Sequence, residues 1–359
     1  MIYFFPHSYL RDRQLDTIRR WPKGDILNPD IVDGRKGKQV SAGYANAGKL
    51  GMSWKQKIPL LNIKLRPRNL PQGAVVYVWG ALIASGKFIV DLDNPWSLVG
   101  YNLRAMPFYR WLIKRVLLSN RCREIRCMSK ACRESLGVLF GAKVYGKAKV
   151  HYPHMPQAVA SVERTSGEIC RFLFIGTQFE IKGGEAMLKA FKHIYERRGS
   201  CYLDVITHLP EEYNTLIESC KGVTIHDARF SRSDIHARFM KNADVLILPT
   251  YVESFGMVAL EALSHGLALI ATDVYALREM TQDSVNGDLI PPPISIWDGV
   301  MPSATYYDLS NIKHRIRVTD TSEFELRLEQ AIEHFVVDPA WRLHARQASI
   351  RLMEERFLC

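Results

Sequence analysis

Short apolar runs alternate along this chain with longer segments in which apolar residues recur every three or four positions. The clearest instance is residues 242–273, where the runs Val245–Leu248 and Leu267–Ala271 flank a segment of helical spacing. A strand, a loop, a helix and a second strand in this order form a βαβ unit, the building block of a parallel sheet. The pattern therefore predicts an α/β fold rather than an all-β fold or a helical bundle.

The alternation also predicts how the chain divides into domains. It lapses over residues 156–168, which we interpret as a linker between a domain of residues 1–155 and a domain of residues 169–338. A length of 359 residues agrees with about two domains. Residues 294–317 show no periodicity and are expected to be irregular, whereas residues 339–359 predict a final helix that is a candidate to cross back to the N-terminal domain.

Charge is divided unequally between the two predicted domains. Residues 1–150 contain 27 Lys and Arg against 9 Asp and Glu, a balance of +18, and the remaining 209 residues contain 21 against 28, a balance of −7, which together give the net charge of +11. The basic half is expected to face an anionic partner, such as a phospholipid surface, a phosphate-bearing substrate or nucleic acid. No nucleic-acid-binding module is recognisable and the acidic half would repel phosphate, so we expect no nucleic-acid partner.

The segment Arg104–Arg126 concentrates this basic charge and has helical character. Its basic positions fall in two sectors, but its apolar positions spread around the helix, which favours a packed helix with snorkelling ends over a membrane-inserted one. We nevertheless expect the basic domain to be attracted to an anionic membrane surface or a polyprenyl-diphosphate acceptor.

Cysteine usage and hydropathy indicate the cellular compartment. The seven Cys residues contain no CxxC pair, so neither a disulfide framework nor a metal site is expected. The N-terminal sequence lacks the basic region of a signal peptide, and the longest apolar run, Val75–Ala84, is shorter than the ~18 residues that a membrane span requires. These features predict a cytoplasmic protein, peripheral on the cytoplasmic face of the membrane.

The first candidate site is a pair of carboxylates, Glu253 and Glu261. Glu253 lies between a predicted parallel strand and the helix that follows it, at the edge of the sheet where open α/β folds bind ligands. The N–H groups of Phe255, Gly256 and Met257 begin that helix and suit a phosphate. Two carboxylates beside a phosphate site can hold hydroxyl groups of two sugars that flank a diphosphate. The alternative is two surface glutamates near a helix N-terminus, which attracts acidic residues without any ligand.

The second candidate site is the loop Gly176–Gly183, which follows a predicted strand and contains Lys182. Glycines admit a bulky anion and a lysine neutralises phosphate charge. The sequence matches neither a Walker loop nor a GxGxxG dinucleotide turn. An ordinary strand-to-helix turn with a solvated lysine is the alternative reading.

Three motifs together resemble a known family. The glycine loop Gly176–Gly183, the block Ala243–Asp273 with its ESFGxxxLEA core, and the segment Asn286–Pro293 follow one another as in the donor-binding half of the retaining GT-B glycosyltransferases of family 4, or glycosyl transferases group 1. The resemblance is strong over residues 170–293 and weak over residues 100–155. It implies two Rossmann-like domains that face each other across a cleft, with a nucleotide sugar held mainly by the C-terminal one.

The resemblance also implies roles for individual residues. Lys182 would bind the donor diphosphate, Glu253 would contact the transferred sugar and Glu261 would hold the ribose. Such enzymes retain the anomeric configuration and do not need a metal, because lysine and helix dipoles replace it. Further implied donor contacts are Gly176, Thr177, Arg229 (beside the base), Ser254, Phe255, Gly256 and Met257.

Some residues depart from the family pattern. Thr177 replaces the usual arginine and removes one cation from the phosphate site. The family often places a histidine after a middle strand of the N-terminal domain, and this chain has Asp91 and Asp93 there, as candidate catalytic groups or as turn residues before Pro95.

The sequence therefore predicts a retaining glycosyltransferase. It would move a sugar from a nucleotide-sugar donor to a glycan or lipid-linked glycan acceptor in cell-surface polysaccharide biosynthesis, such as that of lipopolysaccharide, without a cofactor. The alternative is a catalytically silent, glycosyltransferase-like binding protein, and a phosphorylase or an epimerase is a further alternative within the fold.

Overall fold

The computed structural model describes residues 1–5, 10–31, 60–162, 169–303 and 309–358. The chain divides into two compact units, and along the described chain the division falls between His154 and Met155. The first unit contains the described residues up to 154 together with residues 298–303 and 309; the second contains residues 155–162, 169–297 and 310–358. Each unit is described by itself.

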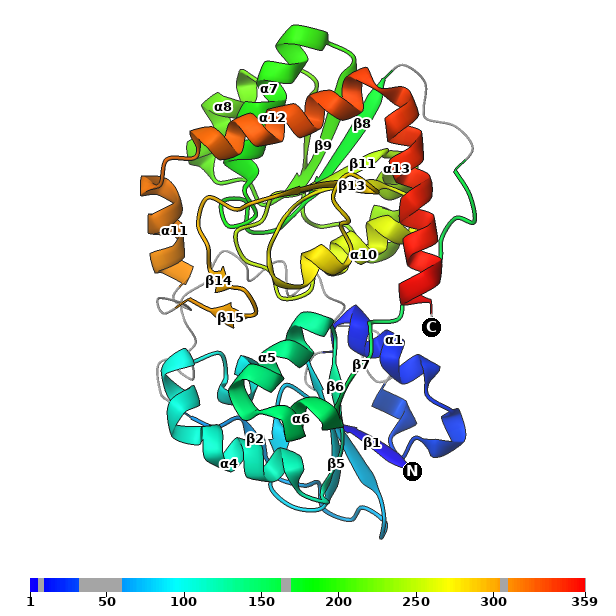
Figure 1. The fold of residues 1–359 in the computed structure, drawn as a ribbon. Helices are drawn as coiled ribbons and strands as arrows, with labels where there is room; N and C mark the ends of the chain where they lie inside the picture. Colours follow the sequence, from blue (N-terminus) through cyan, green and yellow to red (C-terminus); the bar gives the residue numbers. More distant parts are fainter. Residues whose placement is uncertain (6–9, 32–59, 163–168, 304–308, 359) are drawn as a thin grey trace. The chain divides into compact units, whose positions relative to one another are not determined.

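The first unit is built on a five-stranded parallel sheet (Figure 1). Its strands succeed one another across the sheet in chain order: β1 (Ile2–Phe5), β3 (Val75–Trp79), β5 (Lys87–Leu92), β6 (Cys122–Cys127) and β7 (Ala148–Val150). Two short strands, β2 (Ile63–Lys64) and β4 (Leu82–Ile83), pair separately. Its helices are α1 (Asp12–Arg20), α4 (Met106–Leu118), α5 (Lys130–Phe140) and α6 (Ala142–Lys147).

An aromatic cluster forms the core beside β1. The ring of Phe4 stacks on Trp79 at 5.8 Å between centroids and meets Trp21 edge-on at 5.7 Å. Ile18 of α1 is buried in the same cluster. Aromatic pairs of this kind contribute about 0.5–1.5 kcal/mol beyond the area that they bury. The cluster therefore fixes α1 and the chain that follows it against the sheet.

The second unit is built on a six-stranded parallel sheet. Along the chain the strands are β8 (Cys170–Ile175), β9 (Cys201–Thr207), β10 (Val223–Asp227), β11 (Val245–Leu248), β12 (Ala268–Thr272) and β13 (Gly287–Ile290), and across the sheet their order is β10-β9-β8-β11-β12-β13. The chain thus winds outward from β8 in one direction and then in the other. This is the doubly wound Rossmann order, and it reverses between β8 and β11.

Helices cover both faces of this sheet (Figure 1). Helix α12 packs on α7, and α13 packs on α10. Since right-handed crossovers put α7 and α10 on opposite faces, each face carries one of these helix pairs. The helices of this half are α7 (Gly184–Arg198), α8 (Asn214–Glu218), α9 (Arg232–Asp234), α10 (Met257–Ser264), α11 (Leu309–Val318, from its second residue on), α12 (Ser322–Val337) and α13 (Pro339–Leu352). Two short strands that pair with each other, β14 (Trp297–Asp298) and β15 (Met301–Pro302), lie where the chain passes from the second unit to the first.

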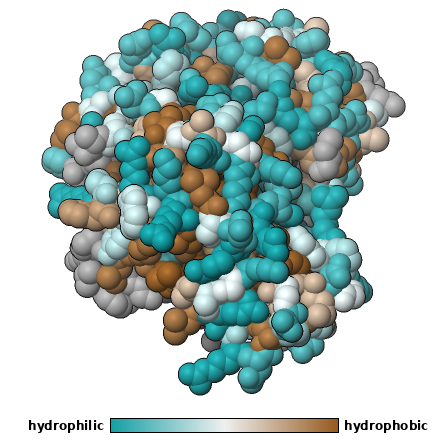
Figure 2. Space-filling view, turned by 60° about the horizontal axis from the view of Figure 1, so that its bottom comes forward, coloured by the Kyte–Doolittle hydropathy of each residue, from teal (hydrophilic) through white to brown (hydrophobic). Residues whose placement is uncertain are grey.

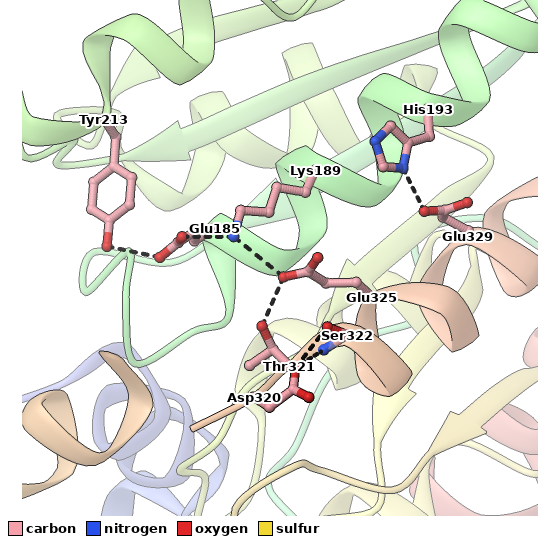
Figure 3. Close-up of polar contacts among 9 residues, drawn as sticks. All are labelled: Glu185, Lys189, His193, Tyr213, Asp320, Thr321, Ser322, Glu325 and Glu329. Atoms are coloured by element: carbon pink, nitrogen blue, oxygen red, sulfur yellow. Dashed lines mark hydrogen bonds and ion pairs between the residues drawn. The ribbon is translucent and has the colours of Figure 1, made fainter. Parts of the chain in front are cut away.

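A seam of polar contacts joins α7 to α12 (Figure 3). Lys189 Nζ lies 3.4 Å from a carboxylate oxygen of Glu325, and His193 Nδ1 lies 2.6 Å from one of Glu329. Exposed ion pairs of this kind each contribute about 0–1 kcal/mol. We therefore infer that the seam sets the register of α12 on α7, while the buried side chains of the two helices supply most of the stability.

The prediction that residues 294–317 are irregular is wrong for helix α11. Ile312 and Ile316 are buried and lie four residues apart, so one narrow stripe of this helix faces the protein. The remaining described side chains are mostly basic or polar, which hides the helical period from a reading of the sequence. The prediction that the final helix crosses back to the N-terminal domain stays a prediction.

Asp288 on the edge strand β13 is an unusual carboxyl group. Its Oδ2 atom is buried and has no hydrogen-bond partner among the described residues. Burial raises the pKa of Asp288 to about 6; His334 opposes this shift and Asp283 adds to it. An unfolded aspartate has a pKa of about 3.9. Folding therefore favours the protonated form, and this favourable contribution is lost as the pH rises from about 4 to about 6.

We predict that Asp288→Asn raises the free energy of unfolding at pH 7 by about 1–3 kcal/mol, because one pKa unit corresponds to about 1.4 kcal/mol. At pH 4 the change should be close to zero. Urea unfolding at both pH values measures it, with Glu218→Gln on exposed helix α8 as the control. An equal effect of Asp288→Asn at the two pH values would contradict the assignment.

Candidate active site

The reversal of strand order in the second unit brings two loops together. Strands β8 and β11 are neighbours, so the loop that follows each begins at the same edge of the sheet. The backbone N–H of Tyr251 in the second loop donates to the carbonyl of Ile181 in the first at 3.0 Å. In doubly wound folds this reversal opens a crevice at the carboxyl ends of the strands, where ligands bind.

An ion pair between Lys182 and Glu253 joins the two loops. Lys182 Nζ lies 2.8 Å from Glu253 Oε2 and donates to the carbonyl of Val252 at 3.1 Å. Burial opposes ionisation of Glu253, but the Lys182 ammonium and backbone N–H donors outweigh it and hold the pKa of Glu253 below its usual value. The Glu253 carboxylate is therefore charged at neutral pH, and the structure places these two sequence-predicted residues side by side.

Two residues just before helix α10 also bind the Glu253 carboxylate. The N–H of Ser254 donates to Glu253 Oε1 at 3.0 Å, and the N–H of Phe255 also hydrogen-bonds the carboxylate. The sequence suggested that the N–H of Phe255 is free for a phosphate, whereas here it contacts a carboxylate of the same loop. The chain immediately before the N-terminus of α10 thus already binds an anion.

The glycines of the first loop allow close packing. A Cβ atom on Gly183, which has φ +73°, would lie 2.1 Å from the carbonyl oxygen of Pro249. A Cβ atom on Gly176 would lie 2.8 Å from Cγ of Lys182. Gly183 therefore lets the loop rest on the end of β11, and Gly176 lets the Lys182 side chain pass over it. Both glycines position Lys182, a role different from the admission of an anion suggested by the sequence.

The second carboxylate of the motif, Glu261, is mostly buried on α10. Its Oε1 atom lies 2.7 Å from Arg232 Nε and 3.8 Å from His236 Nε2. Behind them, His236 Nδ1 and His265 Nε2 are 3.0 Å apart. Burial, with His236 close by, lowers the pKa of His265 to about 4, so His265 is neutral at physiological pH.

Arg232, His236 and His265 are site residues that the sequence did not reveal. Arg232 lies 29 positions before Glu261, on the short helix α9, and no motif or spacing connects them.

The loop Gly176–Gly183 makes a further contact, with helix α11, that the sequence did not predict. Glu180 is buried, and its carboxylate lies 2.5 Å from Lys313 Nζ and 2.6 Å from an Arg317 nitrogen, both on α11. Burial raises the pKa of Glu180, but the hydrogen bonds from these two cations outweigh it, so the pKa lies below the usual value. Helix α11 thus anchors the loop that carries Lys182.

Arg229 does not lie beside the Lys182–Glu253 pair. Its side chain is 85% exposed and pairs with Asp227 at the end of β10, the edge strand, which β9 and β8 separate from β11. Thr177 lies half-buried in the loop after β8. The roles of both as donor contacts stay predictions.

The candidate carboxylates of the first unit are engaged within that unit. Asp91 is buried, with Oδ1 3.2 Å from Arg13 Nη1 and Oδ2 accepting from the Tyr77 hydroxyl at 2.7 Å. Asp93 accepts from the Tyr101 hydroxyl at 2.9 Å. These contacts support the structural reading of both residues, and their catalytic role stays a prediction.

Part of the chain is similar to a known family. Residues 170–297, which include the switch point and both glutamates, match the family model of Glycosyl transferases group 1. The predicted resemblance is therefore confirmed over this part of the chain. Over 125 residues the chain is 30% identical to the lipopolysaccharide glucosyltransferase WaaG of Escherichia coli, a match that covers 34% of this chain and 33% of that protein. The chain spans about a third of the length of the curated relatives it matches.

Solved structures extend the likeness to the whole chain at the level of fold. The crystal structure of WaaG, a glycosyltransferase involved in lipopolysaccharide biosynthesis, aligns with 100% of this chain and 96% of that chain, at a TM-score of 0.57 and 13% identity. HepE of Anabaena in complex with UDP and glucose aligns with 99% and 95%, at a TM-score of 0.54 and 11% identity. At such identities the likeness concerns the fold, and the predicted GT-B class is confirmed.

We predict that Gly183→Ala destabilises the second unit by about 1–3 kcal/mol more than Gly199→Ala, because overpacking adds to the strain of a positive φ. Gly199 is a matched control, since it has φ +66° and a Cβ there would meet nothing within 4 Å. Denaturant unfolding measures the difference. Equal losses in the two variants would show that the contact with Pro249 does not constrain the loop.

Proposed function

We propose that this protein is a retaining glycosyltransferase that moves a sugar from a nucleotide-sugar donor to a glycan or lipid-linked glycan acceptor. The observation that carries the proposal is the Lys182–Glu253 pair, which lies at the switch point of a doubly wound sheet within the segment that matches the group 1 family. A cation, a carboxylate and a helix N-terminus in one crevice suit a substrate that joins a diphosphate to sugars.

Each residue of the crevice has a role in this proposal. The donor diphosphate binds the Lys182 ammonium and the N–H groups of Ser254 and Phe255, just before α10, which in this structure hydrogen-bond Glu253. Glu253 then contacts the transferred sugar, and Glu261, oriented by Arg232, accepts hydrogen bonds from the ribose.

The proposed chemistry rests on positioning and electrostatics. As the bond to the sugar breaks, negative charge grows on the departing diphosphate, and Lys182 with the dipole of α10 stabilises it. The departing phosphate takes the proton of the acceptor hydroxyl on the face that it leaves, so the anomeric configuration is retained. We propose that no metal ion is required, because these groups supply the positive charge.

The comparisons support the choice of substrates. The solved structure of HepE contains UDP and glucose, and WaaG is named as a lipopolysaccharide glucosyltransferase. We therefore propose a nucleotide-sugar donor and an acceptor from cell-surface polysaccharide biosynthesis.

We predict that Lys182→Met and Glu253→Gln each lower kcat by about 100-fold or more, as expected when a group that stabilises transition-state charge is lost. Nucleotide release from a panel of nucleotide sugars, with glycan acceptors present, measures activity. Methionine keeps the aliphatic stem of Lys182 that lies over Gly176, so the variant tests the charge. Lys221→Met, in an exposed position of the same unit, is the control.

Two results would contradict the proposal. Undiminished turnover in both site variants would show that the Lys182–Glu253 pair is not the active site. Nucleotide-sugar binding in a thermal-shift assay, without turnover of any donor by the wild-type protein, would favour the catalytically silent binding protein.

We also propose that the first unit binds an anionic membrane surface through helix α4. The helix buries Met106, Ile113 and Leu117 on one side, but Phe108 is 80% and Trp111 68% exposed. Large exposed apolar side chains of this kind mark interaction sites. Figure 2 shows apolar residues, in brown, interspersed with hydrophilic ones, in teal, on the face that it draws.

Basic side chains accompany these aromatic ones. Arg110, Lys114 and Arg115 are exposed on α4, and the Arg115 guanidinium lies 5.5 Å from the centroid of the Trp111 ring. The sequence favoured a packed helix over an inserted one, and the structure gives α4 both a packed side and an apolar exposed side. None of the helices in the described chain has the length and hydropathy that crossing a bilayer requires. The proposed association is therefore peripheral, on the cytoplasmic face of the membrane.

We predict that Phe108→Ser/Trp111→Ser reduces pelleting with vesicles of phosphatidylcholine and phosphatidylglycerol several-fold, because each aromatic side chain contributes apolar burial in the lipid interface. Leu65→Ser is the matched control, since Leu65 is 81% exposed but lies outside α4. High salt should release the wild-type protein. Equal pelleting of the double variant and wild type would exclude α4 as the contact.

A further inference from the structure

The second unit has a pocket at the edge of the sheet opposite to the candidate active site. It lies by the amino ends of β8 and β11 and has a volume of about 630 Å³. The charged residues that line it are Arg171, Asp204, Arg238, Lys241, Asp244 and Arg346. Lys182 and Glu253 follow the other ends of the same two strands, so the pocket is separate from the donor crevice.

A buried ion pair forms the floor of this pocket. Arg346 Nη1 on α13 lies 2.6 Å from Asp244 Oδ1, and Arg346 Nε donates to the carbonyl of Gly266 at 2.9 Å. The second oxygen of Asp244 accepts from the backbone N–H of Arg171 at 3.0 Å. Both charged groups of the floor are nearly inaccessible to solvent, so the floor is fixed.

Three exposed cations form the walls. Arg171, Arg238 and Lys241 are exposed, and none lies within 4 Å of a carboxylate oxygen of the described residues, although the charge of Arg238 helps to lower the pKa of the exposed Asp234. The Arg238 guanidinium lies 4.8 Å from the ring centroid of Phe230, and that of Arg171 lies 5.9 Å from the ring centroid of Tyr202. A guanidinium that rests on an aromatic face keeps its N–H donors at the ring edge available for an anion.

The charges of the lining favour a dianion. Four cations face two carboxylates, of which Asp244 is paired with Arg346 and Asp204 with His226, at 2.7 Å. The local balance of +2 contrasts with the balance of −7 over residues 151–359. A local concentration of positive charge on an acidic half of the chain attracts anions to that place selectively.

We propose that this pocket binds a small phosphorylated solute, whose phosphate group accepts hydrogen bonds from Arg171, Arg238 and Lys241. Arginine forks match the geometry of phosphate oxygens, and lysine adds a point charge. The volume exceeds that of a bare phosphate and lies within the range of small-molecule pockets, which leaves room for the organic part of a phosphate ester.

Titration calorimetry with inorganic pyrophosphate at constant ionic strength tests the proposal. Because pyrophosphate also fits the proposed donor crevice, the measurement uses the Lys182→Met protein. In that background we expect binding to persist, and we expect Arg238→Gln/Lys241→Gln to weaken it at least ten-fold. Lys192→Gln/Lys221→Gln, which removes two cations outside the pocket, should leave it unchanged.

Several outcomes would overturn the proposal. Loss of all pyrophosphate binding in Lys182→Met alone would place the binding in the donor crevice. Equal pyrophosphate affinity of the pocket variant and its control would show that this pocket does not bind the phosphate. Pelleting with phosphatidic acid vesicles that depends on Arg238 and Lys241 would assign the pocket to a lipid phosphate rather than a soluble ligand. Circular dichroism spectra that match the parent confirm that each variant is folded.

Discussion

The ion pair between Lys182 and Glu253 is the interaction on which the rest of the site depends. It bridges the loops that follow two neighbouring strands, and it exists because the strand order reverses between those strands. Removal of one partner would leave a charge in a poorly solvated place, which costs several kcal/mol. The surrounding features, Gly183 on Pro249 and Glu180 under α11, hold the Lys182 loop where this pair can form.

The same interaction has a meaning for ligand binding. In this structure Glu253 binds the Lys182 ammonium and the N–H donors that the proposed function assigns to a diphosphate. In that proposal, donor binding exchanges one anion for another beside Lys182. Glu261 is paired in a similar way with Arg232. Each of the two carboxylates therefore has a cationic partner in its poorly solvated place.

The sequence predicted the parts of the structure in which local pattern and tertiary environment agree. The run Val245–Leu248 is a fully buried strand, as predicted. Lys182 and Glu253 lie side by side because each follows a strand of this kind. Contacts between distant segments left no local signal. Arg232 reaches Glu261 only through the fold, and α11 has too few apolar residues to reveal its period. The turn-like surroundings of Asp91 gave no sign that Arg13 would pair with it.

The contact between Gly183 and Pro249 has a consequence for how this site can vary. A side chain at position 183 would collide with the carbonyl oxygen of Pro249, so this position tolerates substitution poorly and holds the backbone of Lys182 in place. Thr177 and Gln178 in the same loop are half-buried and are not glycines. Side-chain changes in this loop are therefore least costly at such positions, and Lys182 is its fixed point.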